Sequence, residues 1–434
     1  MTVHFIGLGG IGMSALARIL IQKGAHVQGS DVFPSALLET LKKEGSLIQI
    51  GHDENNLKNA TRVIVSSGIK DDNIELKAAK EMDLPIFHRS DLLDELMQDK
   101  TKILVTGTHG KTTTSSLLTH VLIVAGLDPS FVIGGFLRPI DINGKLGTGE
   151  HFVAEADESD GSFLKTDADF AILTSLTDEH LDYWGTSEAL HAAFQQFIDQ
   201  ADELFWCYDE ESLRKLKTKG TSYGFSEKAD LQIKNIRPIK NGILFDFGFF
   251  KDIELNLLGL HNALNGSAVF GLALHLGIPE EIIREAFRSF PGTRRRLEVK
   301  GECHKLTVYD DYAHHPKEIK VTLKALRDHI RERRLICIFQ PHRYSRVRDQ
   351  LAEFPKCFDD ADLLLVTDIF SAGEALIPGI TSEKFFAHLE EHLGRKVCYI
   401  PRETLESEVA SFVQPHDVVT VSYTHLTLPT NREV

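Results

Sequence analysis

At 434 residues the chain is too long for one hydrophobic core, and a prior of roughly 150 residues per domain predicts about three domains. A hydrophobic content of 42% and a charged content of 26% are typical of a globular protein, and we expect no membrane insertion because no apolar run has spanning length. The net charge of -15 argues against nucleic acid as a partner, since a phosphate backbone would be repelled. The five cysteines show no metal-ligand spacing and no signal peptide is visible, so we expect reduced thiols and a cytoplasmic location.

Short apolar runs alternate with amphipathic stretches along the chain, which predicts an α/β fold with parallel sheets. The first domain is predicted at residues 1–98. It opens with the strand Val3–Ile6, followed by the turn Gly7–Gly12 with GxGxxG spacing and a helix over Met13–Lys23. Asp31 follows about 20 residues later, where an acid can bind a ribose hydroxyl. The turn predicts a diphosphate site for NAD, FAD or a UDP-sugar, with a purely structural glycine turn as the alternative.

The second domain is predicted at residues 99–292 and begins with the most informative segment of the chain. Gly107–Thr113 (GTHGKTT) follows the apolar run Ile103–Val105 after one residue, Thr106. A strand, a glycine-rich turn and a helix leave backbone N–H groups available to phosphate oxygens. Lys111 would add a charge at the β- and γ-phosphates, and the hydroxyl of Thr112 or Thr113 could reach Mg²⁺. The loop is a shortened variant, because Val105 stands where the usual pattern has its first glycine.

Two further segments of this domain carry acids after apolar strands. Phe152–Asp160 ends a strand at Glu155, where a phosphate-loop protein places a Mg²⁺ ligand. Four acids within this short segment repel one another, so a cation or several donors must lie nearby; a solvated acidic loop is the alternative. The segment Thr177–Asp182 brings His180 to the end of the next strand as a metal-ligand or acid–base candidate, or as a structural histidine.

Gly259–Asn265 is predicted to open a helix, in which the asparagines cap the helix or bind a purine edge. Arg294–Arg296 follow a Pro-Gly pair at the second boundary and can form salt bridges or clamp a transferring phosphoryl group. The third domain is predicted at residues 293–422, with strands near 335–339, 363–367 and 417–421. Residues 423–434 contain no glycine and no helical period, and we interpret them as a foreign or aberrant tail in place of the true C-terminus, with a genuine but irregular end as the alternative.

Six motifs in this order resemble those of the Mur ligase superfamily: GTHGKTT, EADESD, GxHN, RRLE, DDYAHHP and QPHR. The resemblance covers about residues 1–422. Family members continue past Val421 with a glycine-rich turn and a helix, so the resemblance implies a C-terminus from which a segment, or a fused domain known in some relatives, could have been lost. The start of the chain, His4–Ser14, is more similar to the alanine-adding member than to the ligase that recycles murein tripeptide. The absence of lysine from Leu181–Gln200 agrees with this, since some relatives carry a carbamylated lysine there.

The resemblance implies a Rossmann-like UDP-binding domain, a central ATP-binding domain of the P-loop type and a Rossmann-like C-terminal domain. It also implies ATP-dependent joining of L-alanine to the lactyl carboxylate of UDP-N-acetylmuramate, with ATP and Mg²⁺ as cofactors and an acyl phosphate as intermediate. Lys111, Arg296 and His342 would be catalytic, with His342 as a candidate base. Thr112, Glu155 and His180 would hold the metal.

The resemblance also implies three binding sets. ATP would be bound by Gly107, Thr108, His109, Gly110, Lys111, Thr112, Thr113, Asn262, Asn265, Arg296 and Asp311. The UDP-sugar would be bound by Gly9, Gly10, Ile11, Gly12, Asp31, Ser66, Ser67, His88, Glu158, Ser159 and Asp160. The amino acid would be bound by His342, Arg343 and Arg346.

Two other classes of protein remain as alternatives at this point. A dehydrogenase would use Gly7–Gly12 for NAD, and a nucleotide-sensing module would bind its ligands without forming product. The sequence does not decide between L-alanine, glycine and L-serine, and it predicts no oligomeric state.

Overall fold

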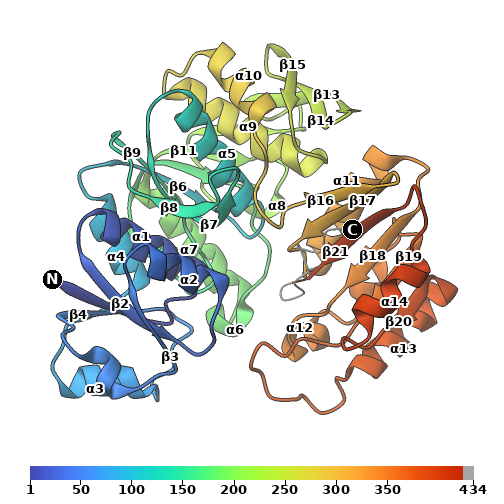
Figure 1. The fold of residues 1–434 in the computed structure, drawn as a ribbon. Helices are drawn as coiled ribbons and strands as arrows, with labels where there is room; N and C mark the ends of the chain where they lie inside the picture. Colours follow the sequence, from blue (N-terminus) through green and yellow to red (C-terminus); the bar gives the residue numbers. More distant parts are fainter. Residues whose placement is uncertain (424–434) are drawn as a thin grey trace. The chain divides into compact units, whose positions relative to one another are not determined.

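The computed structural model describes residues 1–423 and divides into two compact units. The first comprises Met1–Asn235, Phe245–Leu255 and Ala263–Thr293, and the second comprises Ile236–Leu244, Asn256–Asn262 and the chain from Arg294 onward. Three sheets form the framework (Figure 1). Most of their strand pairs are parallel, which confirms the predicted α/β class. Among the described residues, no helix combines the length and apolar character that crossing a bilayer requires.

The N-terminal sheet is parallel, with strand order β3-β2-β1-β4-β5. The predicted first strand and helix are confirmed as β1 and α1. The elements are β1 (Thr2–Ile6), α1 (Ile11–Gln22), β2 (His26–Asp31), α2 (Ala36–Lys43), β3 (Leu47–Ile50), β4 (Arg62–Val65), α3 (Ile74–Glu81), β5 (Ile86–His88) and α4 (Arg89–Met97). The order places β1 at the centre, so the turn that follows it lies at the middle of the sheet edge where ligands bind.

The central sheet has the order β15-β14-β13-β12-β11-β10-β6-β9-β7-β8. The strands around β6 are buried on both faces, as expected for the apolar run Ile103–Val105. Its elements are β6 (Thr101–Thr106), α5 (Lys111–Val124), β7 (Ser130–Leu137), β8 (Ile142–Lys145), β9 (His151–Glu155), β10 (Ala168–Leu173), α6 (Leu181–Trp184), α7 (Ser187–Gln200), β11 (Ala201–Cys207), α8 (Glu211–Arg214), β12 (Thr221–Gly224), β13 (Leu231–Ile239), β14 (Gly242–Phe247), β15 (Phe250–Leu255), α9 (Leu260–His275) and α10 (Glu280–Ser289).

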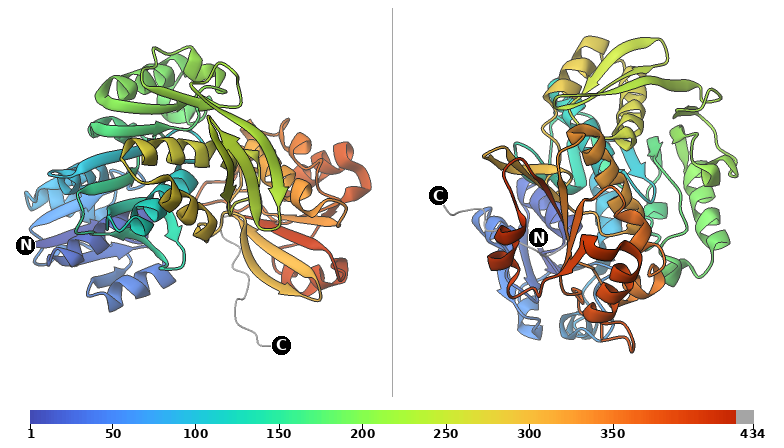
Figure 2. Two further views of the ribbon diagram at one scale, coloured as in Figure 1. Left: turned by 90° about the horizontal axis from the view of Figure 1, so that it is seen from above. Right: turned by 90° about the vertical axis from the view of Figure 1, so that its right-hand side faces the viewer.

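Helices α9 and α10 lie beside β15 in the views of Figures 1 and 2. The contact is close, because a Cβ on Gly266 of α9 would lie 2.8 Å from the Leu255 side chain. The helix predicted to open at Gly259–Asn265 is therefore confirmed and is packed against the sheet.

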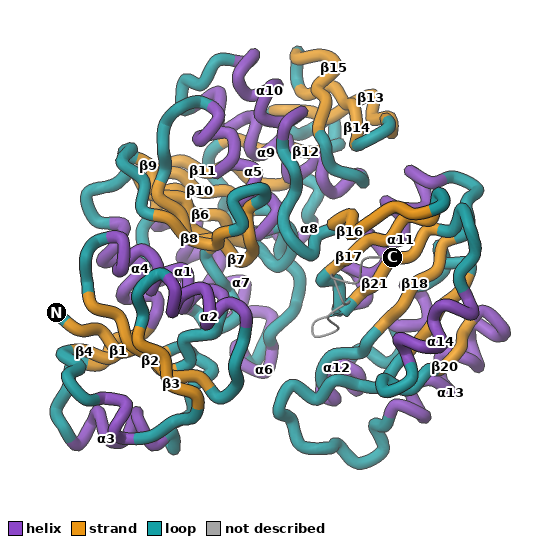
Figure 3. The backbone as a smooth tube through the Cα atoms, in the orientation of Figure 1, coloured by secondary structure: helices purple, strands orange, loops and turns teal. Residues whose placement is uncertain are grey.

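The C-terminal sheet has the order β16-β17-β21-β18-β19-β20 and lies between helices (Figure 3). Successive residues of β18 point to opposite faces: Cys337 packs with α11 and α13, whereas Ile336 packs with α14. The elements are β16 (Glu298–Cys303), β17 (Leu306–Asp311), α11 (Pro316–Ile330), β18 (Leu335–Phe339), α12 (Tyr344–Asp349), β19 (Leu363–Val366), α13 (Ser382–Leu393), β20 (Val397–Tyr399), α14 (Leu405–Phe412) and β21 (Val418–Ser422). Tyr423 packs in the α14-side core, and residues 424–434 of the predicted tail lie outside the described residues.

A buried polar network underlies the N-terminal sheet. Glu75 of α3 is fully buried and accepts hydrogen bonds from His4 Nε2 at 3.0 Å, Ser30 Oγ at 2.6 Å and Asn56 Nδ2 at 2.6 Å. Burial by itself would raise the pKa of Glu75, but these hydrogen bonds outweigh it and lower the pKa to about 2. The network therefore ties α3 to β1 and β2.

We predict that this network stabilises the N-terminal sheet above pH 4.5, the ordinary pKa of Glu75, and that the contribution is lost as the pH falls toward 2. The Glu75→Gln variant places a side-chain NH₂ group among groups that donate to the carboxylate. Its free energy of unfolding should fall by about 2–4 kcal/mol at neutral pH. It should also lose the pH dependence in this window. Hydrogen exchange of the β1 and β2 amides measures both effects. Glu81→Gln, an exposed site on the same helix, is the control; equal exchange in the two variants would contradict the prediction.

Candidate active site

The phosphate-type loop lies between β6 and α5. Gly107 and Gly110 adopt φ of +127° and +86°, in the region that favours glycine. Gly110 occupies the N-cap position of α5 and has no side chain to cap the first turn. The N–H groups of that turn are thus directed at the space beyond the helix, a geometry that suits an anion.

The loop passes close to α9 and is held by the segment after β10. A Cβ on Gly110 would lie 2.6 Å from Asn265 Oδ1, so only glycine fits there without a shift. His109 N donates to Ser175 Oγ at 2.8 Å, and Thr108 N donates to Ser175 O at 3.2 Å. These contacts fix the backbone of the loop before any ligand arrives.

Lys111 lies among three carboxylates. Its Nζ donates to Glu158 at 2.7 Å and to Gly107 O at 2.6 Å. Burial would lower the pKa of Lys111, but the charges of Glu158, Asp157 and Glu155 outweigh it and raise the pKa above its ordinary value. The lysine is therefore firmly protonated and is the cation that the acidic segment requires.

Glu155 at the end of β9 meets the first turn of α5. Thr112 Oγ1 donates to Glu155 Oε2 at 2.9 Å, and Gly134 N donates to the same oxygen at 2.8 Å. Thr112 is therefore the hydroxyl that faces the acid, while Thr113 is the next residue along α5. Burial raises the pKa of Glu155 and Lys111 opposes that effect, so a cation here would be favourable. A hydroxyl beside a carboxylate is a donor set that Mg²⁺ prefers.

His180 takes a left-handed conformation with φ of +56° at the start of α6. Its Nε2 lies 3.8 Å from Glu158 Oε1, an oxygen that is buried without a hydrogen bond. Glu158, expected at the UDP-sugar site, thus lies between Lys111 and His180. The metal-ligand role of His180 stays a prediction.

The glycine turn after β1 is closed by Asp31, whose Oδ2 accepts from Gly9 N at 2.8 Å. Gly10 occupies the N-cap position of α1 and has no side chain to cap the helix. The first turn of α1, with Ile11 and Gly12, is therefore uncapped, like the first turn of α5. The residue expected to bind ribose therefore also shapes the turn. Its second oxygen lies near Phe33 N, at 3.4 Å.

Residues expected at the UDP-sugar site cluster around a cation that sequence reasoning missed. Ser67 Oγ hydrogen-bonds to His88 Nε2 at 2.9 Å and also to Asp160. Arg89, the first residue of α4, binds Asp160 at 2.9 Å and Asp157 at 3.2 Å. The sequence signal for Arg89 was the acid run at 155–160, which required a cation or several donors nearby.

Ser66 and Ser159 complete the expected set without a side-chain role here. Ser66 O accepts from Ile69 N in the turn after β4. Ser159 N donates to Asp157 Oδ1 at 3.2 Å, which helps to orient that carboxylate.

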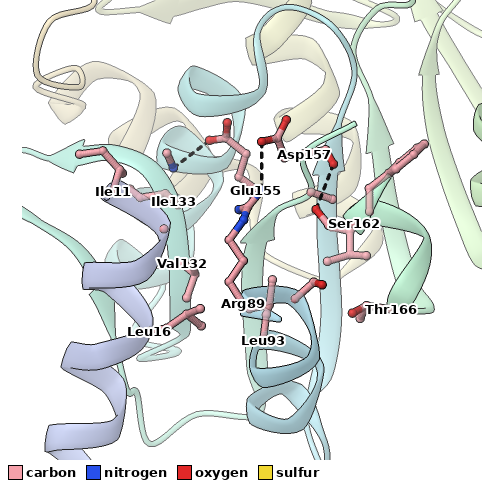
Figure 4. Close-up of a pocket in the computed structure, with 16 residues that line it drawn as sticks. Ile11, Leu16, Arg89, Leu93, Val132, Ile133, Glu155, Asp157, Ser162 and Thr166 are labelled. Atoms are coloured by element: carbon pink, nitrogen blue, oxygen red, sulfur yellow. Dashed lines mark hydrogen bonds and ion pairs between the residues drawn. The ribbon is translucent and has the colours of Figure 1, made fainter. Parts of the chain in front are cut away.

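A cavity of about 190 Å³ lies beside these groups, inside the first unit. In Figure 4, Ile11 and Leu16 of α1 lie beside Val132 and Ile133 of β7 on one side of the cavity, and Ser162 and Thr166 lie on the other side. Arg89 extends toward Asp157, and Glu155 lies at the same end of the cavity. An apolar chamber with charged groups at one end fits a ligand that has a carbon framework and an anionic group.

The second unit holds the expected residues of the third domain. Asp311 at the end of β17 is buried and accepts from Leu297 N and Ala313 N, both at 2.8 Å. Burial raises its pKa, while the Arg296 charge opposes the rise. Arg296 lies over the Tyr312 ring at 5.5 Å. Asn262, expected at the adenine, donates to Leu258 O at 2.8 Å, as a residue at the start of α9 can.

His342, the candidate base, is held between Arg346 and Phe370. Its Nδ1 lies 2.9 Å from Arg346 Nη1, which always donates, so a neutral ring carries its proton on Nε2. The ring stacks on Phe370, with 5.8 Å between centroids. The role of His342 as a base stays a prediction. Arg343, with φ of +69°, precedes α12.

His314 has the opposite ring tautomer to His342. Its Nδ1 lies 2.8 Å from Tyr312 O and therefore donates, which leaves Nε2 as the acceptor nitrogen. Burial and the charges of Arg346 and Arg296 outweigh the neighbouring Glu318 and lower the pKa of His314 to about 4, so the ring is neutral at pH 7.

Three family models match the chain in order. They are the Mur ligase family catalytic domain over residues 2–101, the Mur ligase middle domain over 105–273 and the Mur ligase glutamate ligase domain over 295–422. The chain therefore belongs to the Mur ligase family, with its three-domain α/β fold. The predicted boundaries at 98 and 292 stay predictions.

Two similar curated proteins of the family have the same name. UDP-N-acetylmuramate–L-alanine ligase of Protochlamydia amoebophila is 45% identical over 96% of this chain and 93% of the relative. The protein of the same name from Anaeromyxobacter sp. strain Fw109-5 is 42% identical with the same coverage. A crystal structure of UDP-N-acetylmuramate–alanine ligase from Thermotoga maritima matches with a TM-score of 0.85, 27% identity and coverage of 98% of this chain and 95% of that one.

We predict that Gly110→Ala destabilises the protein more than Gly→Ala at an ordinary left-handed glycine, because Asn265 lies close to Gly110. Gly126 has φ of +74° and open space around it, so Gly126→Ala is the matched control. The control should cost about 1 kcal/mol and Gly110→Ala about 1–2 kcal/mol more, through its clash with Asn265. Hydrogen exchange of the first α5 amides measures the difference. Adding Asn265→Ala should remove the excess; an unchanged excess would show that this contact is not its source.

Proposed function

We propose that this protein is an ATP-dependent ligase that joins L-alanine to the lactyl carboxylate of UDP-N-acetylmuramate in peptidoglycan precursor synthesis. The observation that carries the proposal is the buried cluster in which Lys111, Thr112 and Glu155 meet at the glycine loop. Curated relatives that bear this name at 42–45% identity support the choice of substrates. We propose a cytoplasmic location for this reaction.

The first unit carries the groups that suit ATP and Mg²⁺. The uncapped start of α5 and Lys111 would bind the β- and γ-phosphates. Thr112 and Glu155, with His180 near Glu158, would hold Mg²⁺, which supplies charge neutralisation at the transferring phosphoryl group. The fit rests on the Gly110 cradle that a Cβ would fill and on the unbonded, buried Glu158 Oε1.

The glycine turn after β1 and the cavity beside it would take the UDP-sugar. The start of α1 would bind the diphosphate, and Ser67, His88 and Arg89 would contact the sugar-bearing portion. Arg89 is a guanidinium that can hold a carboxylate by two parallel hydrogen bonds. A ligand carboxylate would compete with Asp157 and Asp160 for this cation.

The reaction then follows in two steps. A carboxylate oxygen of the lactyl group attacks the γ-phosphorus, the bond to ADP breaks, and an acyl phosphate forms. The L-alanine nitrogen attacks the acyl carbon, loses a proton, and phosphate leaves. Lys111 contributes by stabilising negative charge on the phosphoryl oxygens, and the protein otherwise acts by positioning. Arg296, Arg343 and Arg346 of the second unit are the cations proposed to act on ATP and the amino acid.

Lys111→Ala should lower the rate of ADP release with all substrates present by about 100-fold or more, because its charge stabilises the transferring phosphoryl group. Lys102→Ala is the control: this lysine belongs to the preceding strand and pairs with Asp167 at 2.6 Å. Its rate should stay within about twofold of the wild type, as expected for loss of a surface pair. A coupled ADP assay gives both values. Wild-type turnover in Lys111→Ala would exclude the phosphate-loop role.

Substrate choice separates this function from a ligase that recycles murein tripeptide and from an NAD-dependent enzyme. With UDP-N-acetylmuramate and ATP present, L-alanine should stimulate phosphate release and the tripeptide should not. NADH should give no fluorescence change on mixing with the protein. Stimulation by the tripeptide alone would favour the recycling activity, and tight NADH binding without UDP-sugar binding would favour a dehydrogenase.

A further inference from the structure

One asparagine links the α1 helix of the N-terminal sheet to the β7–β8 hairpin of the central sheet. Asn143 of β8 is fully buried. Its Nδ2 donates to Ile11 O at 2.7 Å and to Ser14 Oγ at 2.9 Å, and its Oδ1 accepts from Arg18 Nη1 at 2.6 Å. The amide thus uses both donors and its acceptor on a single helix, and two of its partners lie in the first turn of α1.

The backbone around Asn143 lies as close to α1 as its side chain does. A Cβ on Gly144 would lie 2.8 Å from Ala15 Cα, so the helix and the hairpin meet with no space for an additional methyl group. Arg18 is held in turn by Glu44 at 2.9 Å. The contact is polar, satisfied and tightly packed, which fixes one relative position of the two elements.

The same hairpin extends directly to the proposed phosphoryl-transfer site. Gly144 of β8 pairs with Val132 of β7, and Val132 pairs with Ala154 of β9, the neighbour of Glu155. Two residues further along β7, Gly134 N donates to Glu155 at 2.8 Å. A short, hydrogen-bonded path therefore runs from the start of α1 to the carboxylate that faces Thr112.

In Figure 4, Ile11 and Leu16 of α1 lie beside Val132 and Ile133 of β7 on one side of the cavity. The contact between α1 and the hairpin therefore fixes the shape of this side of the cavity. None of the Asn143 contacts is needed to form either sheet, because each sheet has its own ladder of paired strands.

We propose that Asn143 is a positioning residue that holds the start of α1 at a defined distance from Glu155, so that a ligand bound at the glycine turn presents its carboxylate in line with the phosphoryl group. This inference rests on the proposed function. A misplacement of about 1 Å between reacting groups can cost about 100-fold in rate. Asn143 therefore affects the phosphoryl-transfer step, although it touches neither substrate.

The test compares three purified full-length variants with the wild type. Asn143→Ala removes all three hydrogen bonds, and Ser14→Ala removes one of them as a milder change. Gln22→Ala is the control, because Gln22 Oε1 accepts from Leu146 N, at 2.6 Å, at the other end of the same helix. Each variant is assayed for kcat, for the dissociation constants of UDP and of ATP–magnesium by calorimetry, and for acyl phosphate formation in a single turnover.

Asn143→Ala should lower kcat and the single-turnover rate by about tenfold to 100-fold, with both dissociation constants within about threefold of wild type. Ser14→Ala should lower them severalfold, and Gln22→Ala should not change them. A folded Asn143→Ala with unchanged kcat would overturn the proposal, as would a loss explained by weaker binding alone. If Asn143→Ala does not fold, an unchanged kcat in Ser14→Ala overturns it. Failure of the proposed function is distinguishable, because the wild type itself would then form no acyl phosphate.

Discussion

The site depends on one electrostatic constraint: a buried ammonium must balance a run of carboxylates. Lys111 is held by Glu158 and by Gly107 O, and the charges of Glu155 and Asp157 help to keep it protonated. Arg89 performs the same balancing task on the other side of the acid segment, through Asp157 and Asp160. Both cations are therefore occupied by protein carboxylates, so an anionic ligand must compete with those carboxylates to bind. Such competition favours ligands with several negative charges, as a triphosphate and a diphosphate-linked acid have.

The topology of the first unit explains why these charges meet. β1, β6, β9 and β10 lie in parallel sheets, and each is followed by a loop that carries polar groups. The carboxyl ends of parallel strands share one edge of a sheet, where helix starts also direct their N–H groups. The β7–β8 hairpin adds the link between the two sheets, since Asn143 holds α1 while Gly134 holds Glu155. The relative positions of α1 and Glu155 are thus set by backbone and side-chain amide groups. The charge of the site comes from the side chains at the strand ends.

In the second unit, the expected site residues are positioned by backbone conformation and hydrogen bonds. Arg295 and Leu297 take positive φ values of 60° and 47°, and the buried Asp311 accepts from Leu297 N. A positive φ is energetically unfavourable for a bulky residue, so this conformation persists only where surrounding hydrogen bonds hold the backbone in place. Here the hydrogen bond from Leu297 N to Asp311 provides that constraint at the residue after Arg296. Hydrogen bonds likewise decide which ring nitrogen carries a proton in the two histidines. Arg346 donates to Nδ1 of His342, whereas Nδ1 of His314 donates to Tyr312 O.

The sequence by itself determined the strands, the two glycine turns and the order of the acid and arginine segments, because hydrophobic period and glycine placement act locally. It also required a cation for the 155–160 acids without naming Arg89. Only the tertiary structure decided that Glu158 pairs with Lys111, that Thr112 and not Thr113 faces Glu155, and that His342 Nδ1 is an acceptor. Asn143 shows the limit most clearly: in the sequence it is an ordinary Asn-Gly turn signal, and its three bonds to α1 exist only because distant segments pack together. Side-chain partners depend on long-range packing, which no local pattern encodes.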